Sequence, residues 1–142
     1  MKILIDANVA LDVLLQRQPF YLSGIQILGL SKSGFELFIS ASSITDLYYI
    51  MNRELKSKET SIQLLKTLIL SVDIATVSGS EIRKAMDLGW GDFEDAVQFT
   101  AGESLSVDYI VTRNTSDFSS ATMHVVTPDD FLRIITSNTD EY

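Results

Sequence analysis

Four aspartates stand where the sequence predicts β-strands to end or the helices behind them to begin. They are Asp6, Asp46, Asp95 and Asp117. Carboxylates that lie within a few ångströms of one another raise one another's pKa, and a bound divalent cation removes that cost. Oxygen ligands without cysteine favour Mg²⁺ or Mn²⁺, which can activate a water and stabilise charge on a phosphoryl oxygen. The acids therefore indicate metal-dependent phosphoryl chemistry, provided that the fold brings them together.

The composition excludes several other kinds of site. The chain has no cysteine and a single histidine. The absence of cysteine rules out a disulfide scaffold, a zinc–thiolate site and a cysteine nucleophile. One histidine cannot form a multi-histidine metal site within a single chain.

The charge balance at first argues against a nucleic-acid partner. The formal net charge is -8, from 11 lysines and arginines against 19 aspartates and glutamates. Such a surface repels the phosphates of nucleic acids unless the charge is unevenly distributed or neutralised by cations. A metal ion bound among the acids would provide that neutralisation locally.

The elements that must position the acids alternate along the chain. Short β-branched runs predict strands at residues 2–6, 35–40, 72–77, 109–112 and 124–126. Helices are predicted at residues 7–16, 19–31, from Ser42 or Ser43 to 55, 58–70, from Ser78 or Ser80 to 89, 92–104 and 128–135. Strands separated by helices predict a three-layer α/β/α sandwich around a central, mainly parallel sheet. Ligands of such folds bind beyond the carboxyl ends of the strands.

The length of 142 residues suits one domain, which we place at residues 1–136, followed by a polar tail at 137–142. No segment approaches the roughly 18 consecutive apolar residues of a membrane helix. The apolar start of the chain is interrupted at once by Asp6 and is too short for a signal peptide. We therefore expect a cytoplasmic protein without a membrane partner.

Each acid also has a purely structural interpretation. Asp6 can cap the helix that begins after it, because aspartate is a favoured N-cap residue. The same role is favoured for Asp92, which stands three residues before an acid at a helix start. Asp46 and Asp117 could be solvated surface acids, and Asp12 is expected on a helix surface. The functional interpretation depends on the set of acids and not on any one of them.

Four segments, taken together, resemble the PIN domain family. They are ILIDANV (residues 3–9), SASSITD (40–46), DFEDAVQ (92–98) and IVTRNTSDF (110–118). Their order and spacing match the family over almost the whole chain. PIN domains are metal-dependent ribonucleases, and the small bacterial and archaeal single-domain members are mostly VapC-type toxins.

The resemblance implies roles for particular residues. The catalytic and metal-binding acids would be Asp6, Asp46, Asp95 and Asp117. Substrate contacts or supporting contacts would come from Asn8, Asp92, Thr112, Arg113 and Asn114. The metal would be Mg²⁺ or Mn²⁺, and a metal-activated water would hydrolyse RNA to a 5′-phosphate and a 3′-hydroxyl.

The chain departs from the family pattern at two positions. The second acid is usually glutamate, and Asp46 is one methylene shorter, so its contact with the metal would run through water. An acid often directly follows the Thr-Arg pair, where this chain has Asn114. That leaves open whether Asn114 or Asp117 is the inner metal ligand, and we favour Asp117 for its charge.

Partners also follow from the resemblance. VapC-type toxins usually form homodimers and are inhibited by a small antitoxin that occupies the acidic groove, often through a basic side chain. An acidic toxin and a basic peptide have complementary electrostatic fields. We therefore expect an RNA substrate, a homodimer and a small antitoxin partner.

Two other functions are weighed against the ribonuclease. A degenerate, non-catalytic PIN-like module would bind RNA or a protein, and the short Asp46 and the uncharged Asn114 favour it. A phosphotransferase of the haloacid dehalogenase type is suggested by the Asp6-Ala7-Asn8-Val9 run, which loosely resembles its opening motif. In that family the second acid is a proton donor, a role that Asn8 cannot perform.

Overall fold

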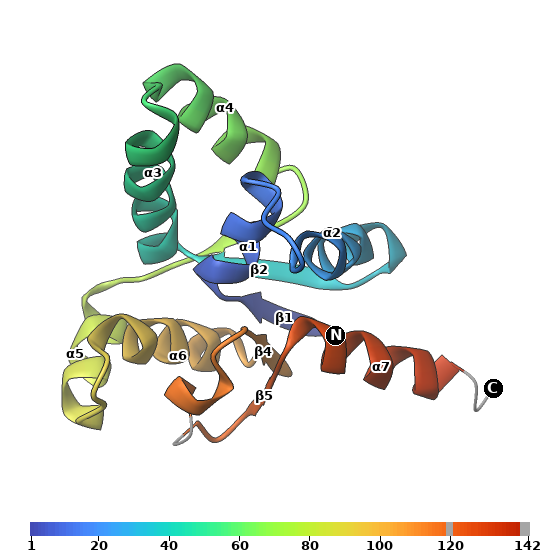
Figure 1. Cartoon of the computed structure of the whole chain (residues 1–142). Coiled ribbons are helices and arrows are strands. Elements are labelled where there is room, and N and C mark those ends of the chain that lie inside the picture. Colours follow the sequence, from blue (N-terminus) through green and yellow to red (C-terminus); the bar gives the residue numbers. More distant parts are fainter. Residues whose placement is uncertain (119–120, 140–142) are drawn as a thin grey trace.

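A computed structural model describes residues 1–118 and 121–139. Its centre is a five-stranded sheet with the order β3-β2-β1-β4-β5 (Figure 1). The strands are β1 (Lys2–Ile5), β2 (Glu36–Ser40), β3 (Asp73–Ala75), β4 (Tyr109–Val111) and β5 (His124–Val126). All four neighbouring pairs are parallel, which confirms the predicted sheet.

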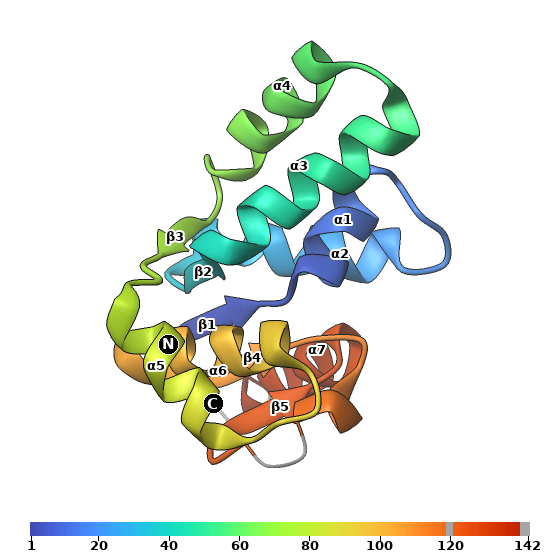
Figure 2. The same cartoon turned by 90° about the vertical axis from the view of Figure 1, so that its left-hand side faces the viewer.

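Helices cover both faces of this sheet. They are α1 (Ala7–Leu14), α2 (Tyr21–Gly29), α3 (Ala41–Leu55), α4 (Lys58–Leu68), α5 (Gly79–Leu88), α6 (Phe93–Leu105) and α7 (Pro128–Thr139), with 3-10 turns η1 (Leu30–Ser33) and η2 (Thr115–Phe118). Apolar side chains of α1 to α4 and α7 form one core with the sheet. Residues of α6 and η2 form the core on the other face, and α5 packs against α6 (Figure 2). The predicted three-layer sandwich is therefore confirmed. None of the described helices is both long and apolar enough to cross a membrane.

The central strand shows why the chain folds in three layers. Ile3 and Ile5 face the core under α1, whereas Leu4 faces the core under α6, and all three are fully buried. A strand that is apolar on both sides is typical of a parallel sheet covered by helices on each face. Because β1 is central, the acid that follows it lies in the interior of the domain.

Local capping signals explain most helix boundaries. Ser78 caps α5 in a capping box with Glu81, and Gly89, at φ 68°, ends the helix in the left-handed conformation that glycine adopts easily. The predicted cap of α3 is wrong, because Ser40 is the N-cap and its hydroxyl accepts from the backbone N–H of Ser43 at 3.2 Å. The chain passes from β2 directly into α3, so the last strand residue also serves as the cap.

The last helix is longer than predicted. It continues to Thr139, although the sequence predicts its end near Ile135 and a polar tail over 137–142. Leu132 and Ile135 pack against the core, and a helix anchored in this way extends at little cost through the polar residues that follow. Residues 140–142 of the predicted tail lie outside the described residues.

Candidate active site

Asp6 directly follows β1 and is almost completely buried, at 6% exposure. Its backbone occupies the N-cap position of α1, but its side chain makes no capping hydrogen bond. Instead, Oδ2 accepts a hydrogen bond from the hydroxyl of Thr112 at 2.6 Å, and Oδ1 accepts from Nε2 of Gln98 at 3.0 Å. Since β1 and β4 are neighbours, the two strand ends lie side by side. The capping interpretation of Asp6 is therefore correct for its backbone and wrong for its carboxylate.

Thr112, directly after β4, connects several of the predicted site residues. Its buried hydroxyl donates to Asp6 and accepts from the backbone N–H of Asn114 at 3.1 Å. The side-chain Nδ2 of Asn8 lies 3.5 Å from the same hydroxyl, and the side-chain Oδ1 of Asn8 accepts from the backbone N–H of Arg113 at 3.4 Å. Asn8 thus joins the first turn of α1 to the segment after β4, and together these contacts hold the carboxylate of Asp6 in place.

Asp95 lies in the first turn of α6, among other acids. Its pKa is raised to about 7 by burial and, next, by the negative charges of Asp92, Asp6, Asp117 and Glu94. Acids far apart in the sequence therefore lie close enough for their charges to interact strongly. The negative charges of Asp6, which follows β1, and of Asp117, in η2, therefore both act on Asp95 at the start of α6.

Asp46, in α3, belongs to the same acidic region. Burial raises the pKa of its carboxyl group. Its charge is the largest cause of the raised pKa of Glu94, which burial and the charges of Asp92 and Asp6 raise further. Glu94 thus lies near both Asp46 and Asp6, although it is not among the site residues predicted from the sequence. The available signal was its position directly before Asp95 in the DFEDAVQ segment.

Asp92 has the capping role that the sequence favours. Its carboxylate accepts a hydrogen bond from the backbone N–H of Asp95 at 3.0 Å, at the start of α6. This contact fixes the first helical turn, on which Asp95 stands. The charge of Asp92 also acts on Asp95, so the cap and the acidic region are coupled.

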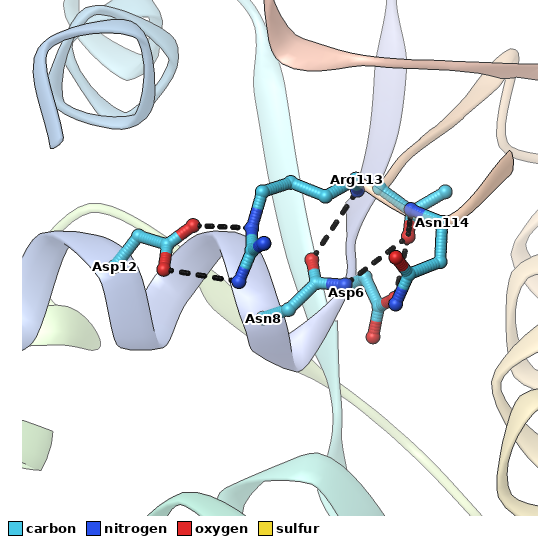
Figure 3. Close-up of polar contacts among 6 residues, drawn as sticks. Asp6, Asn8, Asp12, Arg113 and Asn114 are labelled. Atoms are coloured by element: carbon cyan, nitrogen blue, oxygen red, sulfur yellow. Dashed lines mark hydrogen bonds and ion pairs between the residues drawn. The ribbon is translucent and has the colours of Figure 1, made fainter. Parts of the chain in front are cut away.

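Asp12 does not lie on a helix surface, as the sequence analysis expected, but is buried at 1% exposure. The Nε atom of Arg113 lies 2.7 Å from its Oδ2, and Nη2 donates to its Oδ1 at 3.3 Å (Figure 3). The guanidinium also lies 4.1 Å from the centroid of the Phe20 ring. Burial nevertheless raises the pKa of Asp12, because desolvation outweighs the attraction of Arg113. The prediction failed because the partner lies far away in the sequence.

Gln98 is a second residue of this region that was not predicted from the sequence. Its side chain bears on whether the region suits a metal ion. It is 5% exposed, and its Oε1 has no hydrogen-bond partner among the described residues. The same amide contacts Asp6, so an acceptor oxygen without a partner lies beside the acids.

Within residues 1–118 and 121–139, no three acidic or histidine side chains are already grouped tightly enough to hold an ion. The donor types and their uncompensated negative charge nevertheless fit Mg²⁺ or Mn²⁺. The signal for Gln98 was its spacing, three residues after Asp95 on one helix face.

Comparisons with known proteins agree with this architecture. Ribonuclease VapC1 of Aquifex aeolicus (strain VF5) is 28% identical over 138 residues, which cover 92% of each chain. The solved structure of VapBC2 from Rickettsia felis, bound to a DNA fragment from their promoter, has a TM-score of 0.68 at 16% identity, covering 89% of this chain and 97% of that one. Mycobacterium tuberculosis VapC20, described as a Sarcin-Ricin loop cleaving toxin, has a TM-score of 0.67 at 14% identity, with coverage of 85% and 95%.

At 16% and 14% sequence identity, the two solved structures show similarity of fold alone. A model of the PIN domain matches residues 2–116, which include every strand from β1 to β4 and all the acids that gather beyond them except Asp117. The chain therefore belongs to the PIN domain family.

Proposed function

We propose that this protein is a metal-dependent ribonuclease and the toxin of a toxin–antitoxin pair. The observation that carries the proposal is the buried carboxylate of Asp6 beyond β1, which contacts the amide of Gln98, whose Oε1 has no hydrogen-bond partner among the described residues. Burial and then the charges of neighbouring acids, Asp6 and Asp117 among them, also raise the pKa of Asp95 to about 7. Acids in such surroundings favour a divalent cation. The name of the Aquifex aeolicus relative, a ribonuclease, supports the same activity.

Asp6, Asp46, Asp95 and Asp117 would hold Mg²⁺ or Mn²⁺. When bound, such an ion would activate a water and stabilise charge on the phosphoryl oxygens. For the open choice between Asn114 and Asp117, we favour Asp117, because its charge acts on Asp95. The backbone N–H of Asn114 is instead engaged with the Thr112 hydroxyl.

Neutral side chains around Asp6 keep its carboxylate in one orientation. Thr112 and Gln98 each donate a hydrogen bond to one of its oxygens. Outer-shell donors of this kind orient metal ligands and commonly affect activity by about 10–100-fold. We therefore assign both residues a positioning role, with Asn8 supporting Thr112.

The alternatives have less support. All four predicted acids are present, and the charges of Asp6 and Asp117 act on Asp95, which disfavours a degenerate, non-catalytic module. A haloacid-dehalogenase-type phosphatase needs a proton donor at Asn8, whose amide oxygen accepts from the backbone of Arg113 and whose amide nitrogen faces Thr112. Membership of the PIN domain family sets this second alternative aside.

Assembly remains a prediction for this chain. Among the solved structures of similar fold, one is described as a toxin–antitoxin complex from Klebsiella pneumoniae, with a TM-score of 0.65 at 20% identity and coverage of 88% of this chain and 96% of that one. The net charge of -8 suits a basic antitoxin segment. We propose such a partner, a homodimer and a cytoplasmic location.

The test combines metal binding with RNA cleavage. Isothermal titration should detect Mn²⁺ binding to the wild-type chain and not to Asp95→Asn. Wild-type cleavage of labelled RNA should require Mg²⁺ or Mn²⁺, stop in EDTA and leave 5′-phosphate ends. Cleavage that survives EDTA would reject the metal mechanism. Mn²⁺ binding without cleavage of any RNA tested would favour the non-catalytic alternative.

A further inference from the structure

A cleft of about 420 Å³ lies next to the acidic region, between the starts of α2 and α7. The two helices lie on the same side of the sheet (Figure 1). The residues of the cleft wall that concern its chemistry are Phe20, Arg113, Asn114, Asp129 and Arg133. This volume is at the lower end of the range of ligand pockets, roughly 300–1,000 Å³.

Asn114 links the cleft to the candidate active site. It forms part of the cleft wall, and its backbone N–H donates to Thr112, whose hydroxyl donates to Asp6. The cleft therefore begins two hydrogen bonds away from Asp6, near enough to receive a neighbouring unit of a polymer bound at the acids.

Arg133 supplies a cation that is free to contact a ligand. Its side chain is 75% exposed, and its ion pair with Asp130, at 3.1 Å, joins two exposed side chains on one helix. Such pairs contribute little to stability and exchange readily for another anion. Asp129 accepts a hydrogen bond from the Ser23 hydroxyl, which orients its carboxylate and leaves its charge in place. The cleft wall carries the two cations Arg113 and Arg133 against this one carboxylate, in a chain of net charge -8, so a phosphate can be held there.

Phe20 supplies a flat apolar surface. The ring is 42% exposed, and the guanidinium of Arg113 lies against it in a cation–π contact. Arg113 is itself held by Asp12, so ring and guanidinium form a rigid pair. An aromatic ring beside a cation is the combination with which proteins bind single-stranded nucleic acids, by stacking a base and contacting a phosphate.

We propose that this cleft binds the RNA nucleotide next to the cleaved phosphodiester, with its base on Phe20 and a phosphate at Arg133. The proposal rests on the proposed ribonuclease function. It adds the path that the bound RNA strand follows from the acidic region into the cleft. It also explains how an acidic protein can hold a polyanion beyond the metal site.

The test measures binding and not cleavage. In an Asp6→Asn background, the probe is a short fluorescein-labelled single-stranded RNA of mixed sequence, followed by fluorescence anisotropy. Phe20→Ala should weaken binding about tenfold, and Phe20→Leu, which keeps the apolar volume without an aromatic face, should do nearly the same. Arg133→Gln should weaken binding and lower the slope of log Kd against log salt by about 0.7, the value for one phosphate contact on a single strand. The matched control is Arg83→Gln, on α5 across the sheet, which should leave the affinity unchanged.

A second measurement guards against misfolded variants. RNA that carries 5-iodouridine should crosslink to the peptide containing Phe20, and crosslinks confined to α4 or α5 would overturn the proposal. Unchanged affinity in both Phe20→Leu and Arg133→Gln would overturn it even if the wild type cleaves RNA. An acidic peptide that binds through Arg133, with RNA affinity unaffected by either variant, would assign the cleft to a protein partner and also overturn it. Weakened RNA binding with no cleavage by the wild type would support the cleft as an RNA site and reject the nuclease activity alone.

Discussion

Two buried aspartates, one before and one within α1, have opposite kinds of hydrogen-bond partner in this fold: one is charged and the others are neutral. Asp12 has a guanidinium against its carboxylate, because Arg113 contacts both of its oxygens. Asp6 receives hydrogen bonds from the neutral groups of Thr112 and Gln98. In the described part of the chain no cationic side chain forms an ion pair with Asp6, and its charge instead adds to that of other acids around Asp95.

The difference separates a carboxylate that has a protein counter-charge from the one that we propose as a metal ligand. A buried charge with a protein counter-charge contributes to one defined packing arrangement, and removing its partner is costly. A buried charge with neutral donors and negative neighbours leaves a deficit of positive charge, which an exchangeable cation can fill. Asp12 thus ties α1 to the segment after β4, whereas the neutral donors around Asp6 leave its charge available for the cation that we propose.

The largest expected effect is on catalysis. Asp6→Asn should lower RNA cleavage by more than about 100-fold, since even outer-shell partners of a metal ligand commonly account for 10–100-fold. The melting temperature should stay the same or rise, because a repulsive charge is removed and the Gln98 amide can turn to hydrogen-bond the new side chain. Thermal unfolding and a cleavage assay measure the two effects. Asp73→Asn, at the start of the edge strand β3 and two strands away from β1, is the control and should retain full activity.

The next effect is on stability, at the other aspartate. Arg113→Met leaves the Asp12 carboxylate buried without its counter-charge, and should lower the free energy of unfolding by about 3 kcal/mol. Asp12→Asn should cost less, because Arg113 is partly exposed and its guanidinium can turn to water. Urea denaturation of both variants measures the asymmetry. An equal loss of unfolding free energy in both variants, or a larger loss in Asp12→Asn, would contradict the view that Asp12 is the buried member of the pair and depends on Arg113.

A smaller effect is expected from the donor that orients Asp6. Thr112→Val removes the hydroxyl at 2.6 Å and should reduce cleavage by about 10–100-fold. Thr112→Ser retains the hydroxyl and should restore most of the activity. The apparent affinity for Mn²⁺ should follow the same order. A fully active valine variant would show that Asp6 is held by other contacts.

The smallest effect is a pH dependence of stability without metal. Because the folded-state pKa of Asp95, about 7, lies above its ordinary value of 3.8, the folded chain binds more protons between these values. The stability from this group is therefore fully present below pH 3.8 and is lost as the pH rises to about 7. Melting curves in EDTA across this window should show the loss, and Asp95→Asn should flatten it. Added Mn²⁺ should stabilise the wild type most above pH 7, because carboxylates must be deprotonated to bind metal.

Local patterns in the chain were enough to predict the sheet and most helices. Strand residues such as Ile3 to Ile5 form a continuous apolar run, and Ser78 and Gly89 mark the two ends of α5 within a few residues of the groups they serve. The capping role of Asp92 was predicted for the same reason. The expectation that Asp6 lies at the carboxyl end of a buried strand rested on the local apolar run before it, whereas the central position of that strand came only from the structure.

Contacts between distant segments could not be read in this way. Asp12 is buried because Arg113 reaches it across 101 positions, and Gln98 and Thr112 hold Asp6 from two other elements. Residue types and their spacing along the chain establish the sandwich, its family and the acids that are candidates for a metal site. Which acid acquires a counter-charge and which is left without one depends on strand order and helix packing, because electrostatic energy falls with distance in space and not with separation in sequence.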